Sequence, residues 1–290
     1  MRRVSIILGF VAVLGLAAVT GSFGLSKSVD PVAAAASKSE SAGGANVALS
    51  VGIAAPNGQS YSLSATGVTD GSSGDVTADL SSLLAAAGVP ATGGSVELRW
   101  LQESGDPVVY VNAPFVAAML PGGQSWIRLD LEQAAKSFGV DLNQVLGQLS
   151  QNPASALDLL RTVGSVQTVG TETLNGESTT HYLATIDLVK AAGQIGSQAQ
   201  SFAQHLIDQG APSSLPVDVW IGDDGLVRQV VLDESATVGG QTGGVHLKLD
   251  LSGYGTSVSV SAPAASDTFD ATGLVQAAAS MPHSSAAFGG

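Results

Sequence analysis

The chain has 290 residues, 44% of them hydrophobic and 12% charged, with no Cys and a formal net charge of −13. Such a chain is too apolar to be disordered as a whole, and its length suits one large domain or two small ones. The lack of Cys excludes disulfides, thiolate metal sites, a catalytic thiol and a lipid-modified Cys. The acidic balance argues against a nucleic-acid partner, because phosphate binding needs a basic surface.

Residues 1–21 have the pattern of a signal peptide or an N-terminal membrane anchor. Two arginines precede a mostly apolar run, as in secretory signals. The run is short for a full bilayer span, which takes about 20 residues, so cleavage and retention both stay open. Residues 22–45 are rich in Ser, Ala and Gly, which predicts a flexible linker. We expect the folded domain over residues 46–279 and a disordered tail over 280–290.

Alternating apolar and polar residues predict strands in the first half of the domain. The clearest alternation covers residues 46–54 and 61–66, on either side of Asn57-Gly58. Asn and Gly tolerate positive φ, so this pair predicts a hairpin turn. Further strands are expected at residues 74–80, 96–100, 107–112 and 126–131.

The middle of the chain changes to a helical period. Apolar residues three and four positions apart predict helical segments between residues 131 and 163. Strands return at 165–174 and 178–186, and Asn175-Gly176 between them predicts the clearest hairpin of the chain. The stretch 187–209 then has an apolar residue at every third or fourth position, which predicts one long helix with a single apolar stripe.

The last third of the chain again alternates, at 217–221, 226–236, 245–251 and 257–261, before a short helix at 272–279. In total the sequence predicts ten or eleven strands, and their hairpin links favour an antiparallel sheet in an α+β fold. Ten strongly twisted strands cannot stay flat. We therefore expect a strongly curved sheet, a half-open β-barrel, with helices covering its concave side.

Signatures of catalysis are missing from the sequence. The four His form no HExxH motif or close pair, and there is no Gly-x-Ser-x-Gly turn or phosphate-binding Gly-rich loop with Lys. Asp223-Asp224-Gly225 lacks EF-hand spacing and is interpreted as a turn. His181 and His246 fall on the polar sides of their strands, where a solvated side chain is expected. We predict no enzyme, no catalytic residues, no metal and no cofactor.

The inward faces of the predicted sheet favour a hydrophobic cavity. Small side chains fill a wide barrel poorly, so a space for an apolar ligand can remain. Alternate strand positions give the expected lining residues, and the apolar stripe of the long helix gives an expected lid. The strand residues are Leu49, Val51, Leu63, Leu98, Trp100, Val217, Val219, Leu247 and Leu249, and the lid residues are Leu188, Ile195, Phe202 and Leu206.

Four strings resemble the LppX/LprAFG family of actinobacterial lipoproteins. They are GQSWIRLDL (123–131), GTETLNGESTTHYLATIDL (170–188), SLPVDVWIGDDGLVRQVVL (214–232) and YGTSVSVSAPAASDTFD (254–270). The likeness covers most of residues 46–275. Residues 19–22 (VTGS) resemble a lipoprotein cleavage box in which Ser22 stands where the acylated Cys would be, a departure that removes the acyl anchor.

The resemblance implies the half-open barrel of LolA/LolB-type carriers, which bind acylated lipids and move them towards the outer envelope. It supplies no catalytic residues. The leading hypothesis is an extracytoplasmic carrier or binding protein for a lipid, such as an acylated glycolipid, that is secreted or anchored in the membrane by its N-terminal helix. Expected partners are the ligand, the membrane surface and an envelope protein. One alternative is a non-enzymatic sensor or scaffold domain, and another is a hydrolase whose esterase activity would depend on His181.

Overall fold

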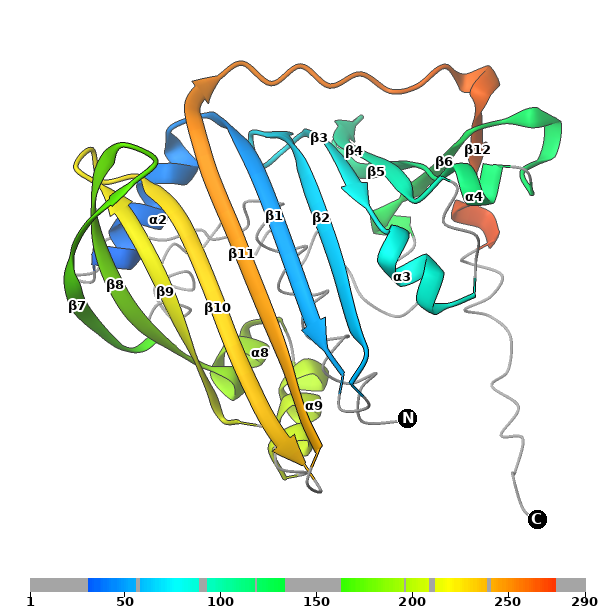
Figure 1. The fold of residues 1–290 in the computed structure, drawn as a ribbon. Helices are drawn as coiled ribbons and strands as arrows, with labels where there is room; N and C mark the ends of the chain where they lie inside the picture. Colours follow the sequence, from blue (N-terminus) through cyan, green and yellow to red (C-terminus); the bar gives the residue numbers. More distant parts are fainter. Residues whose placement is uncertain are drawn as a thin grey trace, which may run out of the picture.

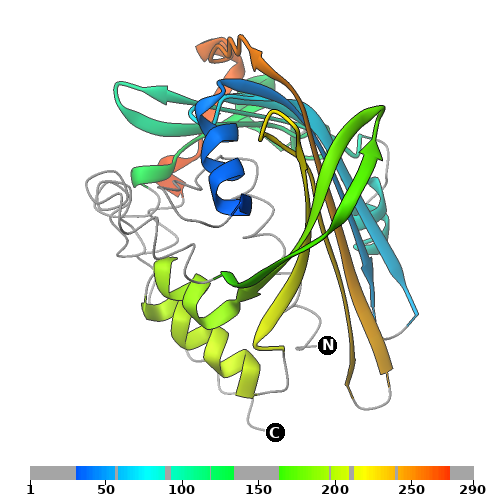
Figure 2. The same ribbon diagram turned by 90° about the vertical axis from the view of Figure 1, so that its left-hand side faces the viewer.

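The computed structural model describes residues 31–55, 58–88, 93–117, 119–133, 163–195, 197–208, 212–238 and 241–274. Its strands form one 12-stranded sheet in the order β12-β6-β5-β4-β3-β2-β1-β11-β10-β9-β8-β7. The sheet is strongly curved and stays open, with β7 and β12 at its two edges (Figure 1, Figure 2).

Strand bounds follow the alternating segments of the sequence. In chain order the strands are β1 (Gly44–Ala54), β2 (Ser60–Thr69), β3 (Gly74–Asp79), β4 (Ser95–Glu103), β5 (Asp106–Asn112), β6 (Trp126–Asp130), β7 (Val163–Leu174), β8 (Glu177–Asp187), β9 (Ser214–Gly222), β10 (Val227–Val238), β11 (Gln241–Thr256) and β12 (Thr268–Asp270).

The predicted fold class is confirmed, with one difference in pairing. All neighbouring strands are antiparallel except β6 and β12, which pair in parallel. The predicted hairpin at Asn175-Gly176 is present, and both residues have positive φ, 52° and 87°. Asn and Gly are the residue types that reach this region at low cost, so the turn follows directly from the sequence.

The parallel strand β12 arises because the chain does not turn back after β11. Residues 257–264 instead run past the ends of the neighbouring strands without forming a strand, so the strand expected at 257–261 was wrong (Figure 1). Val258 lies against Gly44, where an added Cβ would come within 2.5 Å of Val258 Cγ2. The Ser-Val-Ser-Val alternation therefore packs a connecting segment onto β1 rather than extending the sheet.

Helices lie on the concave side of the sheet, as predicted (Figure 2). Helix α2 (Pro31–Ser41) buries Ala33 and Ala35, and helix α8 (Leu188–Ile195) buries Leu188. The flexible linker expected over 22–45 was therefore wrong for the residues of α2 and for Gly44 and Ala45, which begin β1. The Ala-rich stretch is a good helix former once it has an apolar surface to cover.

The long helix expected over 187–209 is two helices, α8 and α9 (Ser197–Asp208), on either side of Gly196. Glycine weakens a helix interior. Short helical segments α3 (Ser81–Ala86) and α4 (Pro114–Ala117) lie in the connections after β3 and β5. The helices predicted between 134 and 162, the N-terminal signal or anchor and the C-terminal tail lie outside the described residues. Among the described residues, no helix has the length and apolar character to cross a membrane.

Candidate ligand-binding face

The concave face of the sheet is an almost continuous apolar surface. Strand register places Val219, Val230, Leu249, Leu49 and Ala65 side by side in one row across five strands. The row continues through Ala78 on β3 to Val96 on β4. Because directly paired residues point to the same side of a sheet, this row shows that the apolar positions of successive strands all face the same way.

Most of the predicted strand positions lie on this face. Leu49, Val51, Val217, Val219, Leu247 and Leu249 are buried in its main cluster, and Leu63 and Trp100 are partly buried against it. Leu98 lies on the same face through its register with Val76 and is half-buried. Of the predicted lid, Leu188 is buried in the cluster. Ile195, Phe202 and Leu206 lie in α8 and α9, and their side chains fall outside the described residues.

Sequence reasoning missed part of the same face. Tyr182, Ala184 and Ile186 of β8 pair in register with Val219, Val217 and Leu215 of β9. They alternate with His181 in the sequence, so the same parity argument that selected the β9 residues also applies to them. The small side chains Ala65, Ala78 and Ala35 lie in the cluster as well. The face therefore spans β8 to β4 with small residues among the large ones.

Trp100 is placed on this face by a glycine. A Cβ on Gly74 would lie 2.1 Å from Trp100 Cζ2, so the indole ring lies directly over the Gly74 backbone. The buried Trp100 Nε1 has no hydrogen-bond partner among the described residues. Buried indole N–H groups normally find a partner, so the polar atom of this apolar wall is available to an acceptor.

Helix α2 is fixed to the β9–β10 turn by polar contacts as well as by its buried alanines. Lys38 Nζ donates to the carbonyl oxygen of Asp224, and Ser39 Oγ accepts the Val227 N–H at 2.9 Å. These contacts place the helix over one end of the concave face, while α8 follows β8 at the other (Figure 2). The concave face is thus covered by helices at both ends.

A polar cluster on the opposite face surrounds His181. Its Nδ1 lies 3.0 Å from Glu172 Oε1 and its Nε2 2.7 Å from Asp218 Oδ1, and its ring stacks on Trp220 at 4.2 Å. Trp220 Nε1 donates to Glu172 Oε2 at 2.9 Å. Hydrogen bonds from Trp220 and His181 lower the pKa of Glu172.

This cluster corrects the expectation that His181 is solvated, because its side chain is only 12% exposed. Glu172 lies nine residues away across the β7–β8 hairpin, whereas Asp218 of β9 lies 37 residues away, so no single local motif indicates both carboxylates. Within the described part of the chain, no group of three or more His, Asp or Glu could hold a metal ion. The cluster joins three strands across the polar face.

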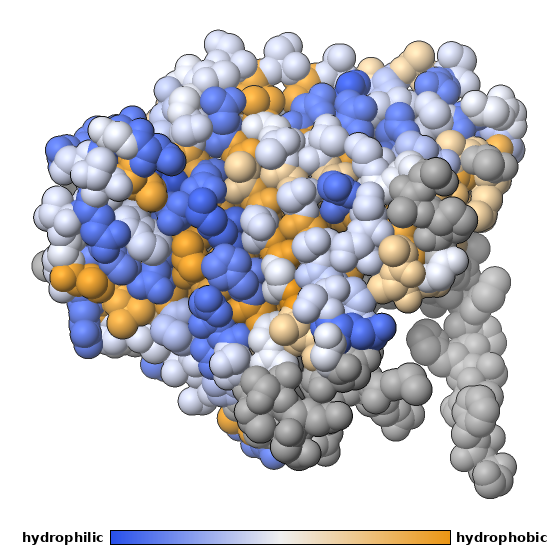
Figure 3. All heavy atoms as spheres, viewed as in Figure 1, coloured by the Kyte–Doolittle hydropathy of each residue, from blue (hydrophilic) through white to orange (hydrophobic). Residues whose placement is uncertain are grey.

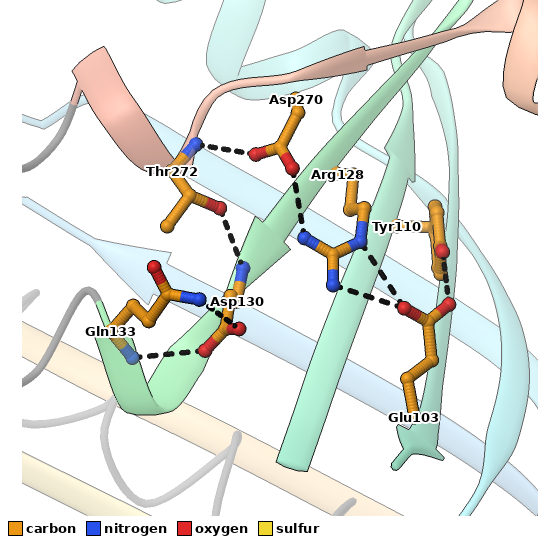
Figure 4. Close-up of polar contacts among 7 residues, drawn as sticks. All are labelled: Glu103, Tyr110, Arg128, Asp130, Gln133, Asp270 and Thr272. Atoms are coloured by element: carbon orange, nitrogen blue, oxygen red, sulfur yellow. Dashed lines mark hydrogen bonds and ion pairs between the residues drawn. The ribbon is translucent and has the colours of Figure 1, made fainter.

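A second polar network fastens β12 to the far edge of the sheet (Figure 4). Arg128 donates to Asp270 Oδ2 at 2.9 Å and to Glu103 Oε2 at 3.0 Å, and the Tyr110 hydroxyl donates to Glu103. Burial raises the pKa of Tyr110, and Glu103 raises it further. Burial alone would raise the pKa of Asp270, but hydrogen bonds from Thr272 and the charge of Arg128 lower it.

No protein-family model matches the chain. A curated protein of Streptomyces griseus, described as an uncharacterized 31.2 kDa protein in the rplA–rplJ intergenic region, is 28% identical over 195 residues. The match covers 65% of this chain and 61% of that protein, so the chain spans about three fifths of the relative's length.

Solved structures similar to this chain include lipoproteins of the group that the sequence resembles. Lipoprotein LppX of Mycobacterium tuberculosis has a TM-score of 0.43 at 17% identity, over 80% of this chain and 96% of LppX. LprF of Mycobacterium bovis has a TM-score of 0.42 at 16% identity, over 81% and 95%. The LolA superfamily protein NE2245 of Nitrosomonas europaea has a TM-score of 0.24 at 12% identity, over 73% and 84%.

Proposed function

We propose that the chain is a non-enzymatic, extracytoplasmic carrier or binding protein for a lipid or another apolar molecule. The single observation that supports it best is the apolar row that crosses the concave face from β9 to β4 under covering helices. The signal-like pattern of residues 1–21 supports the location, with secretion and membrane anchoring both open.

The chemistry needed is shielding rather than reaction. Each CH₂ exposed to water costs about 0.8 kcal/mol, so a chain of about 16 carbons costs on the order of 12 kcal/mol to bring into water unaided. A face lined by Leu, Val and Ala can replace the membrane interior without any catalytic group. The expected ligand is therefore an acyl lipid, such as an acylated glycolipid, held along the concave face.

Native mass spectrometry of the purified full chain tests this proposal. We expect a co-purified apolar molecule, released by organic solvent. Leu98→Trp should reduce its occupancy, because Leu98 is half-buried on the concave face and a larger ring there would take up ligand space. The matched control is Thr77→Trp, at an exposed position on the opposite face of the neighbouring strand.

Both variants should keep the wild-type circular dichroism spectrum. A wild-type chain that carries no apolar molecule, even after exposure to envelope lipids, would contradict the proposal. Equal loss of occupancy in Leu98→Trp and Thr77→Trp would contradict the placement of the ligand. Recovery of one envelope protein without lipid would instead favour the scaffold alternative.

A further inference from the structure

Two neighbouring connections of the sheet carry no charged side chain. There is no Asp, Glu, Lys or Arg from residue 80 to 96 or from 107 to 127, although the chain has a net charge of −13. The β2–β3 and β9–β10 turns, by contrast, hold Asp70, Asp223 and Asp224, and Glu103 and Asp106 flank the β4–β5 turn. The charges of the chain are therefore distributed unevenly over its connections.

The two uncharged connections lie together in space. In an antiparallel succession, the β3–β4 and β5–β6 connections leave the same end of their strands. A Cβ on Gly93 would lie 3.1 Å from Pro114 Cβ, which places the two connections in contact. We call the described residues 80–88, 93–96, 113–117 and 119–125 the uncharged rim; it includes α3 and α4 (Figure 1).

Apolar side chains project from this rim. Met119 is 79% exposed, and Phe115, Val116 and Leu120 beside it are partly exposed. On the face seen in Figure 3, strongly polar side chains gather over β8–β10 and along the upper edge, while α3 presents apolar and weakly polar ones. An exposed apolar group without charges among it is a feature of interaction sites.

The backbone of the α4 connection is already hydrogen-bonded within itself. The N–H groups of Val116 and Ala117 donate to Ala113, that of Met119 to Val116 and that of Leu120 to Ala117. These four N–H groups enter an apolar medium at low cost, because each already has a backbone partner and loses no water there.

The base of the connection is fixed to the C-terminal segment. Ser125 Oγ donates to Asp267 Oδ2 at 2.8 Å, and Gln124 Nε2 donates to the Thr268 carbonyl oxygen at 2.8 Å. These two hydrogen bonds therefore fix the base of the connection that carries the apolar tip around Met119.

We infer that the uncharged rim is the surface by which the protein contacts a lipid membrane, with Met119 and its neighbours entering the headgroup region. The lack of charge on the rim favours a membrane over a protein partner. Anionic headgroups repel an acidic protein, so this chain must approach them through an uncharged part of its surface. The carboxylates that border the rim, Asp79 and Asp267, accept hydrogen bonds from Ser81 and Ser125, so the rim itself offers a charged docking partner no side chain to pair with. The inference goes beyond the proposed carrier function and needs no bound ligand.

An environment-sensitive probe on single cysteines tests it in the full chain. The protein has no Cys, so Met119→Cys and Ala85→Cys each give one labelled site on the rim, and Ser72→Cys gives one in the β2–β3 turn. The vesicles are phosphatidylcholine with and without phosphatidylglycerol, and brominated acyl chains serve as quenchers. Because residues 1–21 can bind vesicles themselves, the readout is the environment of each probe rather than binding.

We expect the probes at 119 and 85 to shift to shorter wavelength and to be quenched, and the probe at 72 to remain in water. Met119→Asp should lower quenching at 85 about tenfold, because it removes an apolar side chain whose burial stabilises the membrane-bound state. Its matched control is Ser72→Asp. Equal responses at 72 and 119, no response at 119, or a response only to added membrane proteins would each overturn the inference.

Discussion

The two ends of this sheet bury opposite faces. From β9 through β11 to β2, the buried side chains lie on the concave face, as in the row from Val219 to Ala65. Across β4, β5 and β6, a second core lies on the other face, where Val108, Tyr110 and Trp126 are buried. The residues that follow them in the sequence, Val109, Val111 and Ile127, face the concave side and are only half-buried.

The difference shows that alternation alone does not decide which face of a strand is core. Strand β5 has apolar residues at both its odd-numbered and its even-numbered positions, so both of its faces are apolar. The face that other residues cover therefore becomes the core. At the half-buried concave positions of β4–β6, part of the apolar side-chain surface stays exposed. They adjoin the uncharged rim, so the proposed ligand face and the proposed membrane contact lie in the same part of the sheet.

Truncating one concave-face residue in β11 and one in β4 should give the largest difference in the free energy of unfolding. Leu249→Ala on β11 should destabilise the protein by about 2–5 kcal/mol, because it opens a cavity in a packed cluster. Leu98→Ala on β4 should cost less than half as much, because its half-buried site loses less contact. Urea denaturation of both variants measures the difference, and equal losses would show that the two halves are packed alike.

Removing the charge that fastens β12 should have the next largest effect. Arg128→Ala leaves Glu103 and Asp270 without their shared cation, with only Tyr110 and Thr272 still donating to them, which should cost about 1–3 kcal/mol. Hydrogen exchange should then increase at the β6–β12 pairing and remain unchanged in β9–β11. Arg128→Lys is the control, since it keeps the charge but loses the two-sided geometry. Faster exchange throughout the sheet would contradict a local fastening.

A methyl group on Gly74 should displace Trp100. Because the new Cβ would lie 2.1 Å from the ring, the indole must move, at a cost of about 1–3 kcal/mol. The Trp100 fluorescence spectrum should change in Gly74→Ala. Gly52→Ala is the matched control, because its nearest neighbour lies at 3.9 Å. An unchanged spectrum in Gly74→Ala would show that the ring does not depend on this glycine.

The smallest expected effect is the pH dependence of the His181 cluster. The folded pKa of Glu172 is lowered, by hydrogen bonds from Trp220 and His181, so its carboxylate stabilises the fold above its unfolded pKa and this contribution is lost as pH falls through the folded value. The stability difference between wild type and Glu172→Gln should therefore be largest near neutral pH and shrink below about pH 4.5.

Trp220→Phe tests the cause of that shift. It removes the largest contribution to the lowered pKa of Glu172 while keeping an aromatic ring against His181. In the Trp220→Phe background, Glu172→Gln should have a smaller effect at neutral pH, measured by urea midpoints. A pH-independent Glu172→Gln effect in the wild-type background would show that the carboxylate is not held in its charged form.

Local patterns predicted the hairpins and the apolar faces, and those parts were right. The β7–β8 turn follows from Asn175-Gly176, and the concave positions of β1, β9 and β11 follow from period-2 alternation. The parallel strand β12 and the α2 helix depend on contacts across more than a hundred residues, and the Asp218 contact with His181 joins β8 to β9 across 37 residues. No local preference indicates such contacts.

The most direct test of the ligand face uses Trp100, which lies on the concave face, whereas Trp126 and Trp220 lie on the opposite one. A chain with Trp126→Phe and Trp220→Phe keeps Trp100 as its single indole. Titrated with a brominated fatty acid, it should show saturable quenching of its fluorescence. A chain with Trp100→Phe, which keeps the other two indoles, should show little. Quenching confined to Trp126 or Trp220 would place the ligand on the wrong side of the sheet and contradict the proposed function.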